Sequence, residues 1–263
     1  MPRRVDWADH PASDLRIDPA RTIALLPVAA IEQHGPHLPL GTDLMIAEGM
    51  LDVLRARCPE DLDLRILPVQ AVGKSNEHLY APGTLTLTAE TALRAWTEIG
   101  LSVARAGVRK LVLISSHGGN VDLTSIVARE LRVQAGMLAV KATWFGFGLP
   151  EALENAWESR HGLHGGEIET SLMLRFRPEL VRMEHAARFA SSAETAPIPP
   201  VGPVALGWIA ADLNPAGVVG DATAATAEKG RQVAEHQTDA LIALLRALEG
   251  LDPTALAPTG HAP

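Results

Sequence analysis

The sequence has 263 residues, of which 47% are hydrophobic, enough to bury one sizeable core. Its 23 Lys and Arg residues against 31 Asp and Glu residues leave a formal net charge of −8. An acidic chain without a basic block is a poor candidate for binding nucleic acid or an anionic membrane, so we expect neither partner. No run of about 18 apolar residues predicts a membrane-spanning helix, and the first residues lack an apolar signal core. The single cysteine, Cys58, fits a reducing, cytoplasmic compartment.

Short apolar runs alternate with segments of helical periodicity along the first half of the chain. The runs suit buried parallel strands, and Thr88 can cap one of the helices. We expect strands at 21–30, 64–69, 110–114 and 137–143, and helices at 42–57, 88–105 and 121–134. This alternation predicts an α/β fold, with a mainly parallel sheet flanked by helices on both faces. Functional groups in such sheets collect in loops at the carboxyl ends of the strands.

The second half of the chain is predicted to complete the same domain. Residues 184–222 are rich in Ala, Pro and Gly and indicate a long ordered loop or lid, whereas 222–249 is typical of a surface helix. Residues 250–263 contain three prolines and suggest a frayed tail. We therefore expect a single catalytic domain over 1–249, followed by a flexible C-terminal tail.

The densest group of metal-binding residue types follows the first predicted strand. Glu32, His34 and Asp43 are all good ligands for Zn²⁺ or Mn²⁺. Glu32 and His34 are two residues apart on an extended stretch, so their side chains point the same way. Asp43 stands at the start of the next helix, where its carboxylate can bridge two cations. The alternative is that these residues only cap and bracket a loop.

A second group follows the strand at 110–114. Ser115-Ser116-His117-Gly118-Gly119-Asn120 places His117 at a strand's carboxyl end, and the glycines permit close backbone approaches. His117 is a candidate metal ligand. The alternatives are a glycine-rich turn with an incidental histidine, or a phosphate-binding loop, although no Gly-rich phosphate signature surrounds it.

A third group combines His164 with the carboxylates Glu167 and Glu169, beside a helix expected to begin near Gly166. The dipole of a helix favours acidic residues at its N-terminus, so a purely structural role is the alternative. The loop after the second strand offers Glu77 and His78 as candidate substrate contacts, or as solvated loop residues. Trp144 follows the fourth strand and is either a substrate wall or a core aromatic.

These groups resemble the motifs of the creatininase family. Glu32-Gln-His34-Gly-Pro-His with Thr42-Asp43 resembles the first metal motif. Ser116-His117-Gly-Gly-Asn120 and His164-Gly-Gly-Glu-Ile-Glu169 resemble the second and third. The resemblance covers most of the chain, from near residue 5 to near residue 245. It implies a flavodoxin-like α/β fold, a two-metal site and a homo-oligomer, which in this family is often a hexamer.

The roles that the resemblance implies can be assigned by position. Glu32, His34, Asp43 and His117 match metal ligands, with Asp43 as the bridging one, and His164 matches the residue that handles the proton. In creatininase proper the ligand histidine is followed by Tyr and a metal-binding Glu, whereas this sequence has Gly118 and Gly119. We expect Glu167 to supply the missing carboxylate, and Glu169 to orient His164 or cap the helix. A Trp expected four residues before the catalytic histidine is Arg160 here, which weakens creatinine as the substrate.

The sequence therefore predicts a metal-dependent amidohydrolase that cleaves a C–N bond in a small cyclic amide or formamide. Two divalent cations would serve as cofactors, either zinc or manganese, with iron as a third option. The alternatives are activity like that of a formamidopyrimidine deformylase or a mycofactocin-type peptidase, or a non-catalytic metal- or ligand-binding protein on the same fold. We expect a small-molecule substrate and a homo-oligomeric assembly.

Overall fold

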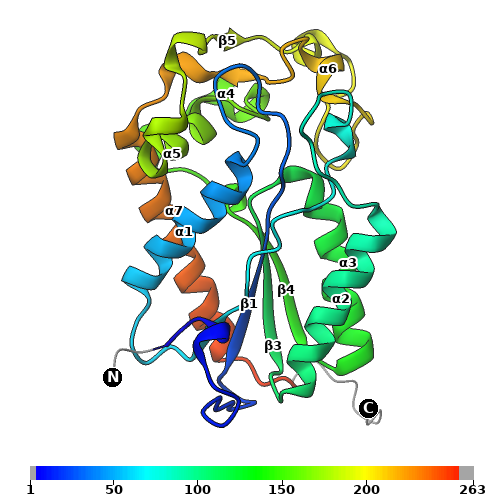
Figure 1. Cartoon of the computed structure of the whole chain (residues 1–263), viewed down its shortest axis with the longest axis vertical. Coiled ribbons are helices and arrows are strands. Elements are labelled where there is room, and N and C mark those ends of the chain that lie inside the picture. The colour runs from blue at the N-terminus through cyan, green and yellow to red at the C-terminus, as the bar shows by residue number, and fades with distance from the viewer. Residues whose placement is uncertain (1–3, 255–263) are drawn as a thin grey trace.

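A four-stranded parallel sheet lies at the centre of the structure, a computed structural model that describes residues 4–254 (Figure 1). The strand order is β2-β1-β3-β4. The strands are β1 (Ile23–Val28), β2 (Leu64–Ile66), β3 (Lys110–Ser115) and β4 (Leu138–Thr143). Ile23 pairs with Leu64 on one side and with Lys110 on the other. The four predicted strands, their parallel pairing and the α/β class are confirmed.

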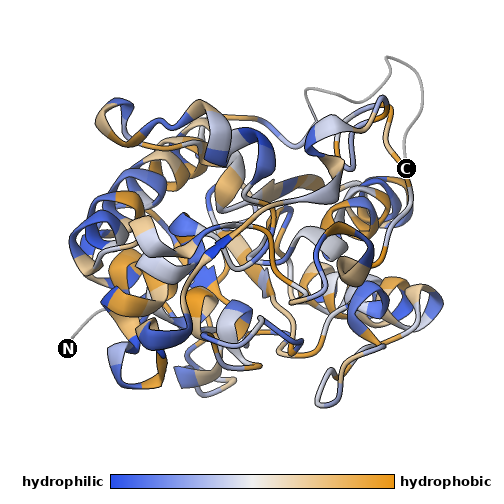
Figure 2. Cartoon of the chain, turned by 90° about the horizontal axis from the view of Figure 1, so that it is seen from above, coloured by the Kyte–Doolittle hydropathy of each residue, from blue (hydrophilic) through white to orange (hydrophobic). Residues whose placement is uncertain are grey.

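Helices cover both faces of this sheet (Figure 1). One face carries α1 (Thr42–Arg57), α5 (Glu167–Phe176) and α7 (Ala227–Glu249), and the other carries α2 (Ala89–Arg105) and α3 (Val121–Ala135). Successive residues of a strand point to opposite faces, so Ile23 and Leu25 pack under α1 and α7, whereas Ala24 and Leu26 pack under α2 and α3. Seen from above, the helices turn hydrophobic residues inward and hydrophilic ones outward (Figure 2).

The ends of the helices follow from local hydrogen bonds. Thr88 caps α2 as predicted, because its side chain accepts a hydrogen bond from the backbone N–H of Thr91. The last helix was expected from 222 but begins at Ala227. The Asp221 side chain instead caps a separate 3-10 turn at Ala222–Ala224, and Thr226 then caps α7. Without these two caps the Ala-rich pattern would permit one continuous helix.

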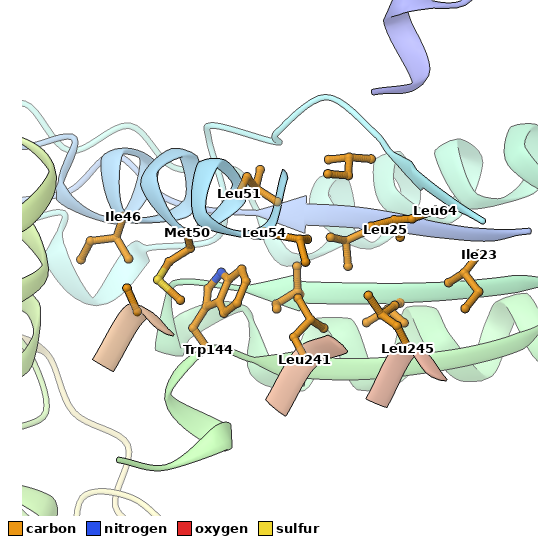
Figure 3. Packing of buried hydrophobic residues seen from close by; sticks show 14 of the residues in the cluster. Ile23, Leu25, Ile46, Met50, Leu51, Leu54, Leu64, Trp144, Leu241 and Leu245 are labelled. Atoms are coloured by element: carbon orange, nitrogen blue, oxygen red, sulfur yellow. The ribbon is translucent and has the colours of Figure 1, made fainter. Parts of the chain in front are cut away.

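Trp144 is a core residue and not a substrate wall, so its predicted substrate contact is wrong. Its side chain is 3% exposed and packs among Ile46, Met50 and Leu241 (Figure 3). The backbone N–H of Trp144 still donates to the carbonyl of Ser115, 3.0 Å away, so the chain has not yet left the edge of the sheet. The indole therefore remains under α1 and α7, where burying a large aromatic surface stabilises the fold.

Short elements from the second half of the chain form a layer above the carboxyl ends of the strands (Figure 1). They include α4 (Ala156–His161), α6 (Ala210–Leu213) and an antiparallel pair of β5 (Arg188–Phe189) with β6 (Gly220–Asp221). The segment expected as a long loop or lid thus contains several short ordered elements. The remaining 3-10 turns are Trp7–Asp9, Asn76–His78, Gly118–Asn120, Phe145–Phe147, Glu151–Leu153, Pro178–Leu180, Met183–His185 and Ser192–Thr195.

The two ends of the described chain lie at the opposite, amino edge of the strands (Figure 1). The buried ammonium of Lys110 ties this edge together by donating to the carbonyls of Ala20 and Glu249, at 2.6 and 2.7 Å. Most of the tail predicted at 250–263 lies outside the described residues, which end at Thr254. No helix within residues 4–254 has the length and apolar character needed to cross a bilayer.

Candidate metal centre

The metal-binding residue types meet at the carboxyl ends of β1 and β3. The chain leaves β1 toward β2 on one side and later returns to β3 on the other, so the strand order reverses between β1 and β3, where ligands bind in open parallel sheets. Glu32 and His34 follow β1, and His117 follows β3. Asp43 lies in the first turn of α1. The hydroxyl of Ser116, in the loop after β3, donates a hydrogen bond to the backbone carbonyl of Asp43 at 2.8 Å and so fixes this turn.

Two groups of three side chains share the Asp43 carboxylate. In the first, Nδ1 of His117 lies 3.3 Å from Oε1 of Glu32 and 3.2 Å from Oδ2 of Asp43. In the second, Nε2 of His34 lies 3.6 Å from Oδ1 of Asp43 and 3.9 Å from Oε2 of Glu169. One oxygen of Asp43 therefore faces each group. This is the arrangement in which a carboxylate can bridge two cations.

The donor atoms of these groups fit a divalent cation. Oε1 of Glu32, Nε2 of His34 and Oδ2 of Asp43 are buried and have no hydrogen-bond partner among residues 4–254. Leaving a buried polar atom unsatisfied costs about 1–3 kcal/mol, and more for a charged group. Mixed imidazole and carboxylate ligands suit Zn²⁺ or Mn²⁺. Oε1 of Glu32 and Oδ2 of Asp43 face the group with His117, and Nε2 of His34 belongs to the group with Glu169, so a cation in each group would satisfy all three atoms.

Backbone groups outside the cluster fix the ligand side chains. A carbonyl oxygen can only accept, so each histidine nitrogen facing one carries the proton. Nδ1 of His34 donates to the Glu32 carbonyl at 3.1 Å, and Nε2 of His117 donates to the Lys74 carbonyl at 3.1 Å. The other nitrogen of each ring is directed into the cluster, where it is free to bind a cation or, without one, a second proton. Ser75 donates from its hydroxyl to the second carboxylate oxygen of Glu32. Such outer contacts orient metal ligands in other proteins.

The charges in the cluster act strongly on one another. Burial alone would lower the pKa of His34, but the carboxylates of Asp43 and Glu169 outweigh it and raise this pKa to about 9. Burial also opposes ionisation of Asp43, whose pKa is nevertheless held well below its usual range by His34 and His117. Burial, reinforced by Asp43, raises the pKa of Glu169 to about 7. Without a cation, protons therefore compensate the clustered carboxylates.

Glu167 does not join this cluster, contrary to the expectation from sequence. Its carboxylate pairs with the ammonium of Lys229 on α7. Residues two apart on a helix point to different sides, so α5, which begins at Glu167, cannot present Glu167 and Glu169 to one cation. Glu169 faces His34 instead, and its Oε2 also accepts from the backbone N–H of Gly165 at 2.6 Å. The carboxylate expected from Glu167 is thus offered by Glu169.

The structure also explains why residue 119 is a glycine. A Cβ at Gly119 would collide with Oε1 of Glu77 and lie 2.6 Å from the Lys74 carbonyl oxygen. Glu77 itself lies 3.5 Å from Nε2 of His117 and pairs with the Lys74 ammonium at 3.0 Å. Glu77 therefore contacts the outer side of His117, a candidate ligand, and not the substrate, as had been expected from the sequence. No side chain at 119 can coexist with Glu77 in this position.

His164 and His78 lie on the remaining side of Glu32. Nδ1 of His164 and Nε2 of His78 are each 3.4 Å from Oε1 of Glu32. His164 also forms a group with Glu32 and His34 that could hold a cation. Burial and the positive charge of His34 hold the pKa of His164 well below its usual value, so its ring is neutral at pH 7. Glu169, expected to orient His164, contacts His34 instead.

Two residues that contact these side chains were missed by the sequence analysis. Gln33 lies between two predicted site residues and bonds to both His78 and His164. Ser75 holds Glu32 from a loop more than forty residues away in the chain. The position of Gln33 within the first motif was an available signal. Nothing in the sequence distinguishes Ser75 from other loop serines.

Comparison with known proteins places these motifs in a family. A family model described as creatinine amidohydrolase matches residues 11–245. The mycofactocin precursor peptide peptidase of Mycobacterium ulcerans is 33% identical over 221 residues, covering 82% of this chain and 81% of that protein. The creatinine amidohydrolase of Pseudomonas putida is 28% identical over 197 residues, covering 68% and 72%. The crystal structure of a putative creatinine amidohydrolase from Bacteroides fragilis has the same fold, with a TM-score of 0.78 at 24% identity over 96% and 99% of the two chains.

Proposed function

We propose, from the premise that this chain belongs to the creatininase family of hydrolases, that it cleaves the amide C–N bond of a short peptide with two bound divalent cations. The observation that carries the metal-dependent part is the Asp43 carboxylate, one oxygen of which faces each of two ligand groups. One group would consist of Glu32, Asp43 and His117, and the other of His34, Asp43 and Glu169. Zinc and manganese both suit these donors.

The chain's own residues supply the proton transfer. Cations at this centre would activate a water molecule and polarise the carbonyl oxygen of the scissile amide. Nε2 of His164 donates to the Gln33 carbonyl at 2.8 Å, so the lone pair of Nδ1 faces the centre. His164 can accept a proton there and deliver it to the nitrogen of the leaving group. Its neutral state at pH 7 is the form needed for the first of these steps.

A peptide is favoured over the small cyclic amide or formamide predicted from sequence. Relatives that are 30–33% identical over about four fifths of the chain act on a precursor peptide. Residue 160 is Arg where the resemblance to creatininase leads one to expect Trp, and Trp144 packs in the core instead of forming a substrate wall. The loops that carry Gln33 and His78 also expose Leu40, Tyr80 and Leu85, which apolar side chains of a peptide could contact.

A small cyclic amide remains the second candidate, because the matching family model is that of creatinine amidohydrolase. Turnover by the zinc- and manganese-loaded protein separates the two. The panel should contain short peptides with free and blocked C-termini, creatinine and other cyclic amides, and formamides. We expect cleavage of at least one peptide and none of creatinine. Turnover of cyclic amides alone would reverse this ranking, and a metal-loaded protein that cleaves none of the panel would favour a binding function.

Replacing His164 by Gln is expected to slow turnover by about 10²–10⁴-fold, the usual range for losing a general acid–base group. Gln cannot accept and release a proton near neutral pH, although it retains hydrogen bonding to the Gln33 carbonyl. Metal content and thermal unfolding should be measured on the same preparation as kcat. Replacing the exposed His185 by Gln is the matched control. Near-normal turnover would assign His164 a structural role, and loss of a cation would make it a ligand.

A further inference from the structure

Four histidines direct one ring nitrogen each toward Oε1 of Glu32, but they do not share one hydrogen-bonding state. Three of them, His34, His117 and His164, have a backbone carbonyl behind the ring, at 3.1, 3.1 and 2.8 Å from the outer nitrogen. A carbonyl accepts only, so the outer nitrogen carries a proton, and the inner nitrogen is the one left to bind a cation or a second proton. Each of these three can therefore act as a ligand or a base.

His78 is the exception among these four. Its outer nitrogen, Nδ1, lies 2.7 Å from Nε2 of Gln33. The orientation of the Gln33 amide is set by its other contacts, because Oε1 accepts from the backbone N–H of Gly35 at 2.9 Å and Nε2 donates to the Gly217 carbonyl at 2.6 Å. If the amide were turned over, its NH₂ would face the N–H of Gly35 and its oxygen would face the carbonyl of Gly217. Both hydrogen bonds would then be lost. The group that faces His78 is therefore an NH₂ donor.

An NH₂ group behind Nδ1 requires Nδ1 to accept, so the single proton of the His78 ring sits on Nε2. That nitrogen is the one directed into the centre, 3.4 Å from Oε1 of Glu32. The His78 and His164 rings lie side by side, with centroids 4.4 Å apart. Gln33 contacts both rings, through its side-chain NH₂ on His78 and its backbone carbonyl on His164. Two adjacent histidines thus present opposite groups, an N–H and a lone pair.

We propose that Gln33 is a positioning residue that fixes His78 as an inward-directed N–H donor, and that His78 hydrogen-bonds the substrate carbonyl oxygen as negative charge develops on it. This inference rests on the proposed amide hydrolysis for the identity of that oxygen. The proton state of His78 follows from hydrogen bonding alone. A preorganised donor of this kind stabilises the transition state more than the ground state, so its loss lowers kcat more than it raises KM.

The backbone around Gln33 is shaped to keep this contact. Gly217 has a φ of +77°, and a Cβ there would lie 2.5 Å from both Oε1 of Gln33 and the hydroxyl of Tyr80. An isolated antiparallel β-bridge between His164 and Val219 holds the segment that contains Gly217. Gln33 is 9% exposed, so water cannot readily replace the amide as the group behind His78. The tautomer is thus set by buried protein groups.

The proton state can be read without substrate. In metal-free protein labelled with ¹⁵N-histidine, a long-range ¹H–¹⁵N correlation spectrum distinguishes a protonated Nε2 from a protonated Nδ1, and the His78 signal is the one absent from the His78→Leu spectrum. We expect Nε2 of His78 to be protonated in the native sequence. In Gln33→Glu, where a carboxylate replaces the NH₂ donor, we expect the proton on Nδ1, and the same change in the exposed Gln134→Glu should alter nothing. A native His78 protonated on Nδ1 overturns the proposal, whether or not Gln33→Glu folds.

Zinc binding and turnover test the role of the donor. His78→Leu should retain the full zinc content and lose about 10²–10³-fold in kcat, the usual effect of removing one such donor. KM should change little, and His78→Gln, which can present an amide N–H, should recover part of the loss. Loss of zinc in His78→Leu would make His78 a ligand, and unchanged kcat would remove it from the reaction. A chain that cleaves no amide at all would refute the proposed function while leaving the tautomer measurement intact.

Discussion

Substitution of Asp43 by Ala is expected to abolish turnover and to lower the occupancy of both cations together. Each oxygen of Asp43 faces a different ligand group, so its loss removes a ligand from both. A catalytic cation contributes several kcal/mol to transition-state stabilisation. Since about 1.4 kcal/mol corresponds to a factor of ten, kcat should fall by more than about 10³-fold. Metal analysis after saturation with zinc or manganese measures the occupancy directly.

The exposed Asp52 on the same helix provides the matched control. It pairs with Arg55 at the surface, and an exposed ion pair contributes little to stability. Asp52→Ala should therefore keep both cations, full turnover and nearly the same thermal unfolding. If Asp43→Ala retained one cation at unchanged affinity, Asp43 would belong to one ligand group only. A maximum of one cation bound by the native sequence would exclude the two-cation site altogether.

Replacing Glu169 by Gln is expected to remove one cation while the other remains. Oε2 of Glu169 lies 3.9 Å from Nε2 of His34, and both belong to the group on one side of Asp43. The group on the other side, with Glu32 and His117, does not contain Glu169. Turnover should fall by a factor similar to that for Asp43→Ala, because both cations are required for the proposed reaction. Titration with metal followed by equilibrium dialysis measures the stoichiometry.

Glu167→Gln is the informative comparison, since Glu167 is the carboxylate that sequence analysis favoured. The structure pairs it with Lys229, so the variant should keep both cations. Weakening a mostly buried ion pair should instead lower the free energy of unfolding by about 1–3 kcal/mol. Thermal unfolding of the metal-free protein measures this loss. Loss of a cation from Glu167→Gln with both retained in Glu169→Gln would transfer the ligand role back to Glu167.

Periodicity and apolar runs in the sequence determined the sheet and its five large helices. The strands β1 and β3 are continuous apolar runs, because both faces of a parallel sheet are covered. Their carboxyl ends carry Glu32 and His117, and the rule that functional loops gather at this edge was enough to bring these residues together. The grouping of Glu32, His34, Asp43 and His117 was therefore available from sequence, because it depends on strand ends and on short spacings along the chain.

Only the tertiary structure decided the direction of those side chains whose orientation depends on where a helix or turn begins. Glu167 and Glu169 are both acidic and two residues apart, and only the start of α5 at Glu167 turns one toward Lys229 and the other toward His34. Trp144 was ambiguous for the same reason, because a single turn after β4 decides between the core and the rim. Local pattern fixes neither direction, since each depends on packing against residues far away in the chain.

The states of the histidines also depend on distant backbone groups. The loop after β2 lies against the loop after β3. Only for this reason does Glu77 contact His117 and occupy the place that a side chain at residue 119 would need. The proton on His78 is set by Gln33, whose amide is oriented by Gly217, more than 180 residues later in the chain. The sequence determined which residue types reach the carboxyl edge of the sheet. Hydrogen bonds formed only in the folded chain decided which nitrogen of each ring faces the centre, because a donor or acceptor behind a ring is a matter of tertiary contact.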